Sequence, residues 1–145
     1  MGLGILNIFR TRAPAPLPVP DARLALGALM VRVAKSDKTY DFEEIRLIDR
    51  LLAQMHGLNP VEAAKLRATC EKIEAQAPDT GEFARLIRDS VEFDQRVQAH
   101  EALWQVMLAD GVANEAESRV VDQVRDALGL SMADCEAARA RANMN

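Results

Sequence analysis

The amino-acid sequence predicts an all-α protein, a single bundle of about seven helices built on two pseudo-repeated helical units. Three observations favour this fold class. Hydrophobic residues make up 49% of the chain but aromatic residues only 4%, whereas strands draw on aromatic and β-branched side chains. Apolar residues recur at helical spacing between residues that commonly cap helices. The stretch from Val33 to Glu44 is also echoed by the stretch from Val106 to Glu117.

Each expected helix follows a residue that commonly forms an N-cap. The caps are Asp21, Asp41, Asn59, Asp79, Ser90, Asn114 and Ser131. Asp41 and Glu44 have the capping-box spacing, in which the cap and the third helical residue exchange hydrogen bonds. We expect Gly57 to end the second helix and Gly129 the sixth, and Pro78 to break the chain after the third. The expected last residues of helices two, four and five are His56, Arg88 and about Leu108.

Three segments divide the 145 residues. Residues 1–12 form a short apolar N-terminal segment, and residues 13–20 form a Pro-rich linker, which favours an extended, semi-rigid chain. Residues 21–142 form the helical domain, long enough to bury a core. We expect the N-terminal segment to be a frayed tail, a strip docked on its own domain, or a segment that binds a partner or a membrane surface. It is too short for a signal sequence, and no apolar run has the length of a membrane span.

The two repeated stretches place acidic or amide side chains at equivalent positions. Asp37 falls on Asp110, Asp41 on Asn114, and Glu44 on Glu117. On a helical wheel, Glu44 and Glu117 both lie on the apolar side of their helices. Burial of a lone carboxylate is costly, so each must be paired, capped, hydrated or protonated. The two acidic turns are therefore the places where chemistry is concentrated.

Three roles are open for these turns. The first is a metal site for a divalent cation such as Ca²⁺ or Mg²⁺, which prefers oxygen ligands. Its candidate ligands are Asp110, Asn114, Glu117, Asp37, Asp41 and Glu44, although their spacing is not that of an EF-hand loop. The second role is structural, because the same side chains can cap helices and close tight turns. The third is acid–base catalysis, which is favoured least because no His, Ser or Cys accompanies the acids.

Charge and cysteine usage narrow the class of protein further. The net charge of -4, without a basic cluster, argues against nucleic acid as a partner. Cys70 and Cys135 lie far apart without a CxxC pattern, which favours buried thiols in a reducing compartment. We therefore expect a cytoplasmic protein with a protein partner, in contact with a membrane surface only if residues 1–12 provide that contact.

Three other side chains have simpler interpretations. His56 precedes the glycine that ends its helix, where a positive charge would complement the helix dipole. His100 lies in the middle of a predicted helix and is a weak candidate metal ligand. Trp104 is expected to belong to the core.

The sequence resembles the TerB-like family of tellurite-resistance proteins, whose fold also forms the N-terminal domain of the DjlA co-chaperone. Leu108-Ala109-Asp110-Gly111, followed by Glu117 and then Gly129-Leu130-Ser131, carries the resemblance, and Asp37, Glu44 and Gly57-Leu58-Asn59 echo it. The resemblance covers residues 21 to 142. It implies an all-α bundle, no established enzymatic activity, roles in stress and metal-oxyanion resistance, and divalent-cation binding at the acidic turns.

The two copies differ at one position that bears on cation binding. Lys38 stands where the second copy has Gly111, which adds a positive charge beside Asp37 and removes the backbone freedom of glycine. A site built from Asp110 and Glu117 is accordingly favoured over one in the first copy.

We therefore expect a non-enzymatic TerB-like binding domain in a stress or tellurite-resistance-type response, with a divalent cation at the acidic turns. The alternative is a protein–protein or membrane-surface adaptor, similar to the co-chaperone domain, whose acidic turns are purely structural.

Overall fold

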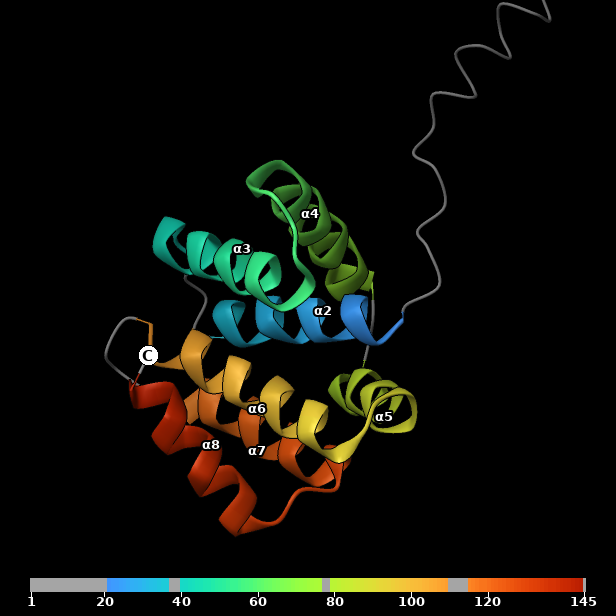
Figure 1. Cartoon of the computed structure of the whole chain (residues 1–145), viewed down its shortest axis with the longest axis vertical. Helices are drawn as coiled ribbons and strands as arrows, with labels where there is room; N and C mark the ends of the chain where they lie inside the picture. The colour runs from blue at the N-terminus through green and yellow to red at the C-terminus, as the bar shows by residue number, and fades with distance from the viewer. Residues whose placement is uncertain (1–20, 37–39, 77–78, 110–114, 145) are drawn as a thin grey trace, which may run out of the picture.

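The computed structural model describes residues 21–36, 40–76, 79–109 and 115–144, and within them every regular element is an α-helix (Figure 1). The helices are α2 (Ala22–Lys35), α3 (Phe42–His56), α4 (Pro60–Gln76), α5 (Thr80–Ser90), α6 (Phe93–Met107), α7 (Glu115–Leu128) and α8 (Met132–Met144). The predicted all-α bundle of about seven helices is thus confirmed. The structural equivalence of the two sequence repeats stays a prediction, and residues 1–20 lie outside the described part.

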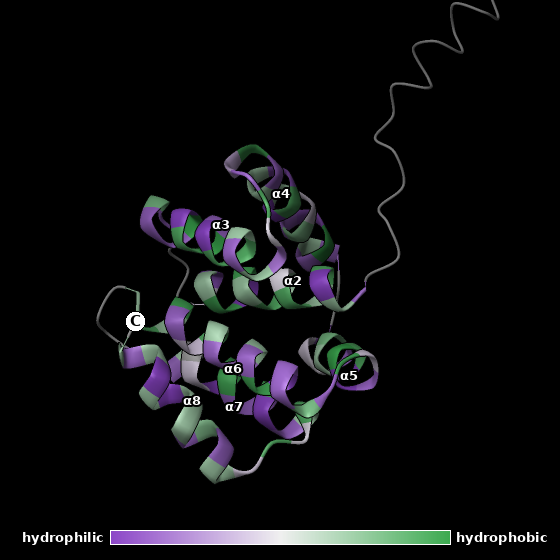
Figure 2. Ribbon diagram, viewed as in Figure 1, coloured by the Kyte–Doolittle hydropathy of each residue, from purple (hydrophilic) through white to green (hydrophobic). Residues whose placement is uncertain are grey.

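Helix α2 is the centre of the bundle. Every residue from Leu24 to Ala34 is buried except Arg32, so this helix is apolar on all sides. Figure 1 shows α2 crossing the middle of the molecule, with α3 and α4 on one side and the later helices on the other. It packs against α3, α4, α5, α6 and α7. Figure 2 shows hydrophobic residues along most of α2, whereas the surface helices alternate between hydrophobic and hydrophilic residues, as expected when only one face of a helix is covered.

The one charged residue in this buried run is held by the helices around it. Arg32 donates from Nε to Glu74 Oε2 at 3.2 Å and from Nη1 to Thr80 Oγ1 at 3.1 Å. Its guanidinium group also lies 5.5 Å from the centre of the Phe83 ring. Glu74 accepts a second ion pair from Lys35 at 2.8 Å. These contacts join the C-terminal end of α2 to the end of α4 and the start of α5.

Local capping chemistry places most of the helix starts where the sequence predicts them. Leu24 N donates to Asp21 Oδ1 at 2.9 Å, and Gly81 N donates to Asp79 Oδ1 at 2.9 Å. Reciprocal capping boxes open three further helices, at Asp41 with Glu44, Asn59 with Glu62, and Ser131 with Asp134. The backbone of the predicted helix terminators Gly57 and Gly129 is left-handed, with φ of 65° and 72°.

The prediction that Ser90 caps the fifth expected helix is wrong. Ser90 is the last residue of α5, and Glu92 is the N-cap of α6 without a side-chain cap hydrogen bond. An N-cap needs extended backbone, and the chain becomes extended only at Val91 and Glu92. Ser90 therefore lies two residues too early to cap α6.

Close contact between α2 and α4 depends on a glycine. A Cβ atom added at Gly27 would overlap Cys70 Sγ and lie 3.8 Å from Leu52 Cδ2. Cys70 is buried and points its thiol toward Leu24 O at 3.7 Å. Because all of these atoms belong to packed helices, neither helix can move away without opening the core.

We predict that Gly27→Ala lowers the free energy of unfolding by about 1–3 kcal/mol, because the added methyl group overpacks the interface. In an uncrowded helix the same change would stabilise the protein by up to about 1 kcal/mol. Urea unfolding of the single variants and of Gly27→Ala/Cys70→Ala provides a double-mutant cycle. We expect the second substitution to recover part of the loss. A Gly27→Ala protein more stable than wild type would show that the two helices are not in close contact.

Candidate functional site

In the first acidic turn, the described carboxylates are bound to the helix backbone. Glu44 N donates to Asp41 Oδ1 at 3.0 Å, and Asp41 N donates to Glu44 Oε1 at a longer 3.4 Å. Glu44 is only 4% exposed, in agreement with its position on the apolar side of the wheel. The arrangement is the capping box that the sequence offers as the structural alternative to a metal site. The third predicted residue of this turn, Asp37, lies outside the described residues.

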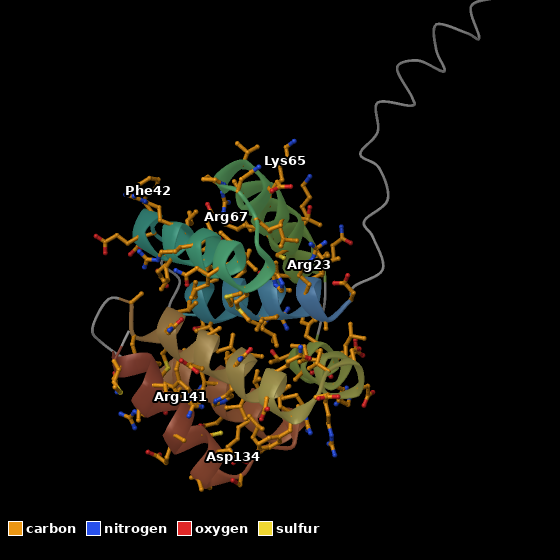
Figure 3. The ribbon with its side chains drawn as sticks, viewed as in Figure 1. Arg23, Phe42, Lys65, Arg67, Asp134 and Arg141 are labelled. Carbon is orange, nitrogen blue, oxygen red and sulfur yellow. The ribbon has the colours of Figure 1, made fainter. Side chains whose placement is uncertain are left out.

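An ion-pair network that sequence reasoning missed lies beside this turn. Tyr40 Oη donates to Glu71 Oε2 at 2.6 Å, and Arg67 Nε donates to Asp49 Oδ1 at 2.6 Å. Arg67 also reaches Glu71 from the same helix, at 3.2 Å. Burial and the neighbouring Glu71 raise the pKa of Tyr40, so its hydroxyl remains a donor. The network fastens α3, and Tyr40 two residues before its start, to α4, and Figure 3 shows Arg67 between these two helices.

In the second acidic turn, the flanking helix ends are described but the candidate ligands are not. Helix α6 closes with Leu108 N donating to Trp104 O at 2.9 Å, and α7 begins at Glu115. Ser118 Oγ lies 3.9 Å from Met107 Sδ, so the first turn of α7 lies against the end of α6. The predicted ligands of this turn, which are Asp110, Asn114 and the side chain of Glu117, lie outside the described residues.

The described side chains contain no cluster of metal-ligand type. Across residues 21–36, 40–76, 79–109 and 115–144, no three His, Cys, Asp or Glu side chains converge in a way that could hold a metal ion. Of the six predicted ligands, the structure brings together Asp41 and Glu44, and it does so through backbone amides.

His100 occupies a buried position between α6, α7 and α8. It is 1% exposed, and its Nε2 lies 3.1 Å from Val121 O, which identifies Nε2 as the protonated nitrogen. Nδ1 is buried without a hydrogen-bond partner among the described groups. Burial lowers the pKa of His100, so the ring is neutral near pH 7. This environment suits a core histidine.

The nearest candidate nucleophile to His100 is a protonated thiol. Cys135 Sγ lies 3.8 Å from His100 Nε2, and burial raises the pKa of Cys135 to about 11. Burial likewise raises the pKa of Cys70 to about 12. Both cysteines are buried and free, as the sequence predicts. Since the thiolate is the nucleophilic form, neither residue is activated near pH 7.

Trp104 occupies its predicted place against the core, whereas His56 does not carry its predicted charge. Trp104 packs against the core as predicted, with its ring centre 6.2 Å from that of His100 in an edge-to-face geometry. The guanidinium group of Arg139 lies over the Trp104 ring, 5.2 Å from its centre. The prediction of a positive charge at His56 is wrong. Burial first, and then the positive charge of Arg23, lower the pKa of His56, so it ends α3 as a neutral ring.

The fold is a small all-α domain in which the central helix α2, buried from Leu24 to Ala34 except at Arg32, is covered by α3, α4, α5, α6 and α7. A family model described as "Tellurite resistance protein TerB" matches residues 23–140, which is most of the chain. The chain therefore belongs to the TerB family, and the resemblance seen in the sequence is confirmed. No curated protein and no solved structure shows a significant match. None of the described helices is both long and apolar enough to cross a membrane.

We predict that stability falls as the pH is lowered through about 6.5, the pKa of an unfolded histidine, because the buried neutral ring of His100 must be protonated on unfolding. Because folding lowers the pKa of His100, the unfolded chain binds more protons than the folded protein at any pH between the two pKa values. The stabilisation is complete above the unfolded pKa and declines below it until the folded pKa is reached, by at most about 1.4 kcal/mol per pH unit for one proton.

Urea unfolding between pH 8 and pH 5 measures this slope. His100→Gln keeps a donor for Val121 O but cannot titrate, so we expect a smaller slope in that variant. His56→Gln is the matched control and should leave the contribution of His100 in place. An unchanged slope in His100→Gln would contradict the assignment.

Proposed function

We propose that this TerB-family chain is a non-enzymatic binding domain in a stress or tellurite-resistance-type response, and that its second acidic turn holds a divalent cation. The ligands that we assign are Asp110, Asn114 and Glu117, and the cation is Ca²⁺ or Mg²⁺, since both prefer oxygen donors. The observation that carries the proposal is the contrast with the first turn. There, Asp41 and Glu44 are already bound to backbone amides.

Three features of the second turn support this choice. It lies between helix ends that are in contact through Met107 and Ser118, so ligands from both helices need to span only a short distance. Gly111 replaces the cationic Lys38 of the first copy, which removes a charge that would repel a cation. The buried, neutral His100 and the protonated thiols favour a binding role over catalysis.

A second candidate is a protein–protein or membrane-surface adaptor in which both acidic turns are structural. The closed capping box at Asp41 and Glu44 favours it, because it shows that one copy of the turn is satisfied by its own backbone. In this case residues 1–12 supply the contact with the partner or membrane. The two candidates differ in whether stability responds to metal.

We predict that Ca²⁺ or Mg²⁺ raises the melting temperature by several degrees relative to EDTA. A ligand that binds only the folded state stabilises it by about 2.7 kcal/mol when its concentration is a hundred times Kd. Asp110→Asn/Glu117→Gln should abolish the shift. Asp41→Ala/Glu44→Ala should lower the melting temperature in every buffer and keep the metal-dependent shift, because it removes a helix cap rather than the cation site.

Asp89→Asn/Glu136→Gln is a control matched in lost charge, since both residues are exposed on other helices. It should retain the shift, which separates ligation from a change in net charge. No metal-dependent shift in the wild type at millimolar metal would overturn the cation site and leave the adaptor as the better account.

A further inference from the structure

A groove of about 830 Å³ opens between α3, the C-terminal end of α6 and the end of α8. Its volume lies within the range of about 300–1,000 Å³ that is typical of ligand-binding sites. The floor is apolar, with Leu51 and Ala142 buried and Leu47 and Leu108 half-buried. The groove can therefore receive an aliphatic side chain, provided that the polar groups along its rim are also matched.

Two guanidinium groups line the rim on the α3 side. Arg46 and Arg50 are exposed and lie one helical turn apart, which places them on the same face. Among the described lining residues Glu43 is the only carboxylate, so two positive charges face one negative charge in this part of the rim. Arg46 also stacks on the Phe42 ring at 5.5 Å, which holds its side chain along the helix surface.

These two arginines differ from others nearby in having no acidic partner. Among the described residues, no carboxylate lies within ion-pair distance of Arg46 or Arg50. By contrast, Arg141 on the adjacent α8 pairs with Glu101 at 3.1 Å, and Arg67 pairs with Asp49 at 2.6 Å. In a protein of net charge -4, these two adjacent cations thus have no acidic partner within the described part of the chain.

We propose that this groove docks an acidic amphipathic segment of a partner protein. Carboxylates spaced one helical turn apart would pair with Arg46 and Arg50, since guanidinium groups bind carboxylates in a bidentate way. An aliphatic side chain between those carboxylates would fill the space above Leu51 and Ala142. This is the recognition of an amphipathic helix by a groove, with charge complementarity setting its orientation.

Charge and shape disfavour the other occupants. The chain's own N-terminal segment, residues 1–12, carries Arg10 and Arg12 and no acidic residue, so it would bring like charges together. A flat anionic bilayer could meet the arginines but not the floor, which is recessed beneath them. The groove has no aromatic residue on which a nucleic-acid base could stack.

Docking of a partner segment in this groove is a separate function from cation binding and does not depend on it. The described lining residues reach Ala109 and lie on α3, α6 and α8 or at their ends. Binding measured in EDTA and again with Ca²⁺ therefore tests the groove separately, because loss of the cation site would leave the peptide affinity in EDTA unaffected.

The test uses the full chain and fluorescein-labelled helical peptides that carry two glutamates one turn apart with leucine between them. Fluorescence polarisation gives the affinity, and matched peptides with glutamine in place of glutamate show how much the carboxylates contribute.

We expect Arg46→Glu/Arg50→Glu to weaken binding of the acidic peptides at least about tenfold. Lys65→Glu/Lys72→Glu makes the same change in charge on exposed positions of α4, away from the groove, and should leave the affinity within about twofold. Lys65 projects from α4 in Figure 3.

Amide NMR spectra of the isotope-labelled full chain identify the residues that the peptide contacts. The acidic peptides should shift signals of residues 46–54 and 105–109, and Ile5→Asp/Ile8→Asp should leave those signals in the free protein unchanged.

The proposal is overturned if no acidic peptide binds at millimolar concentration, or if the Arg46/Arg50 and Lys65/Lys72 double variants lose affinity equally. It is also overturned if the Ile5/Ile8 variant shifts the groove signals, which would identify the chain's own N-terminal segment as the occupant. Binding of anionic phosphatidylglycerol vesicles that depends on Arg46 and Arg50, without peptide binding, would assign the groove to a membrane surface instead.

Discussion

Because every residue from Leu24 to Ala34 except Arg32 is buried, α2 is stable only when other helices cover it on all sides. Full burial of one leucine-sized side chain is worth about 1.5–3 kcal/mol, so this single helix gives the surrounding helices a common reason to assemble. Its close approach to α4 requires Gly27, and the half-buried charge of Arg32 is bound by groups from α4 and α5. The positions of the turns between helices follow from this central element.

The two acidic turns share a sequence pattern but are placed differently relative to that core. The first joins α2 to α3, and its carboxylates close a capping box while Tyr40 and Arg67 fasten the region to α4. The second joins α6 to α7, at the end of the bundle where the groove of α3, α6 and α8 also opens. One copy is therefore committed to structure. Ala109, the last described residue before the proposed cation ligands, lines the proposed docking groove.

The sequence alone predicted those structural features whose physical cause lies within a few residues along the chain. Asp21, Asp79 and the capping-box pairs were predictable because each cap bonds amides two or three residues away, and the wheel placed Glu44 correctly because helical geometry fixes the side of the helix on which a residue lies. The prediction that Ser90 is an N-cap was wrong because a serine can end one helix as readily as it begins the next. The charge of His56 was misjudged because burial and Arg23, which is distant in sequence, decide its pKa. The pairing of Arg67 with Asp49 and the groove lined by three helices depend on tertiary packing, which one sequence does not specify.

The central claim is that two similar turns have different roles, one closed by its own backbone and the other holding a cation. Paramagnetic broadening by Mn²⁺, which favours the same oxygen ligands, measures this directly in amide spectra of the full chain. The account predicts saturable broadening centred on Ala109 and on Glu115 to Ser118, reversed by EDTA or by excess Mg²⁺. Broadening centred instead on Asp41 to Ile45, or spread evenly over the acidic surface, would contradict it.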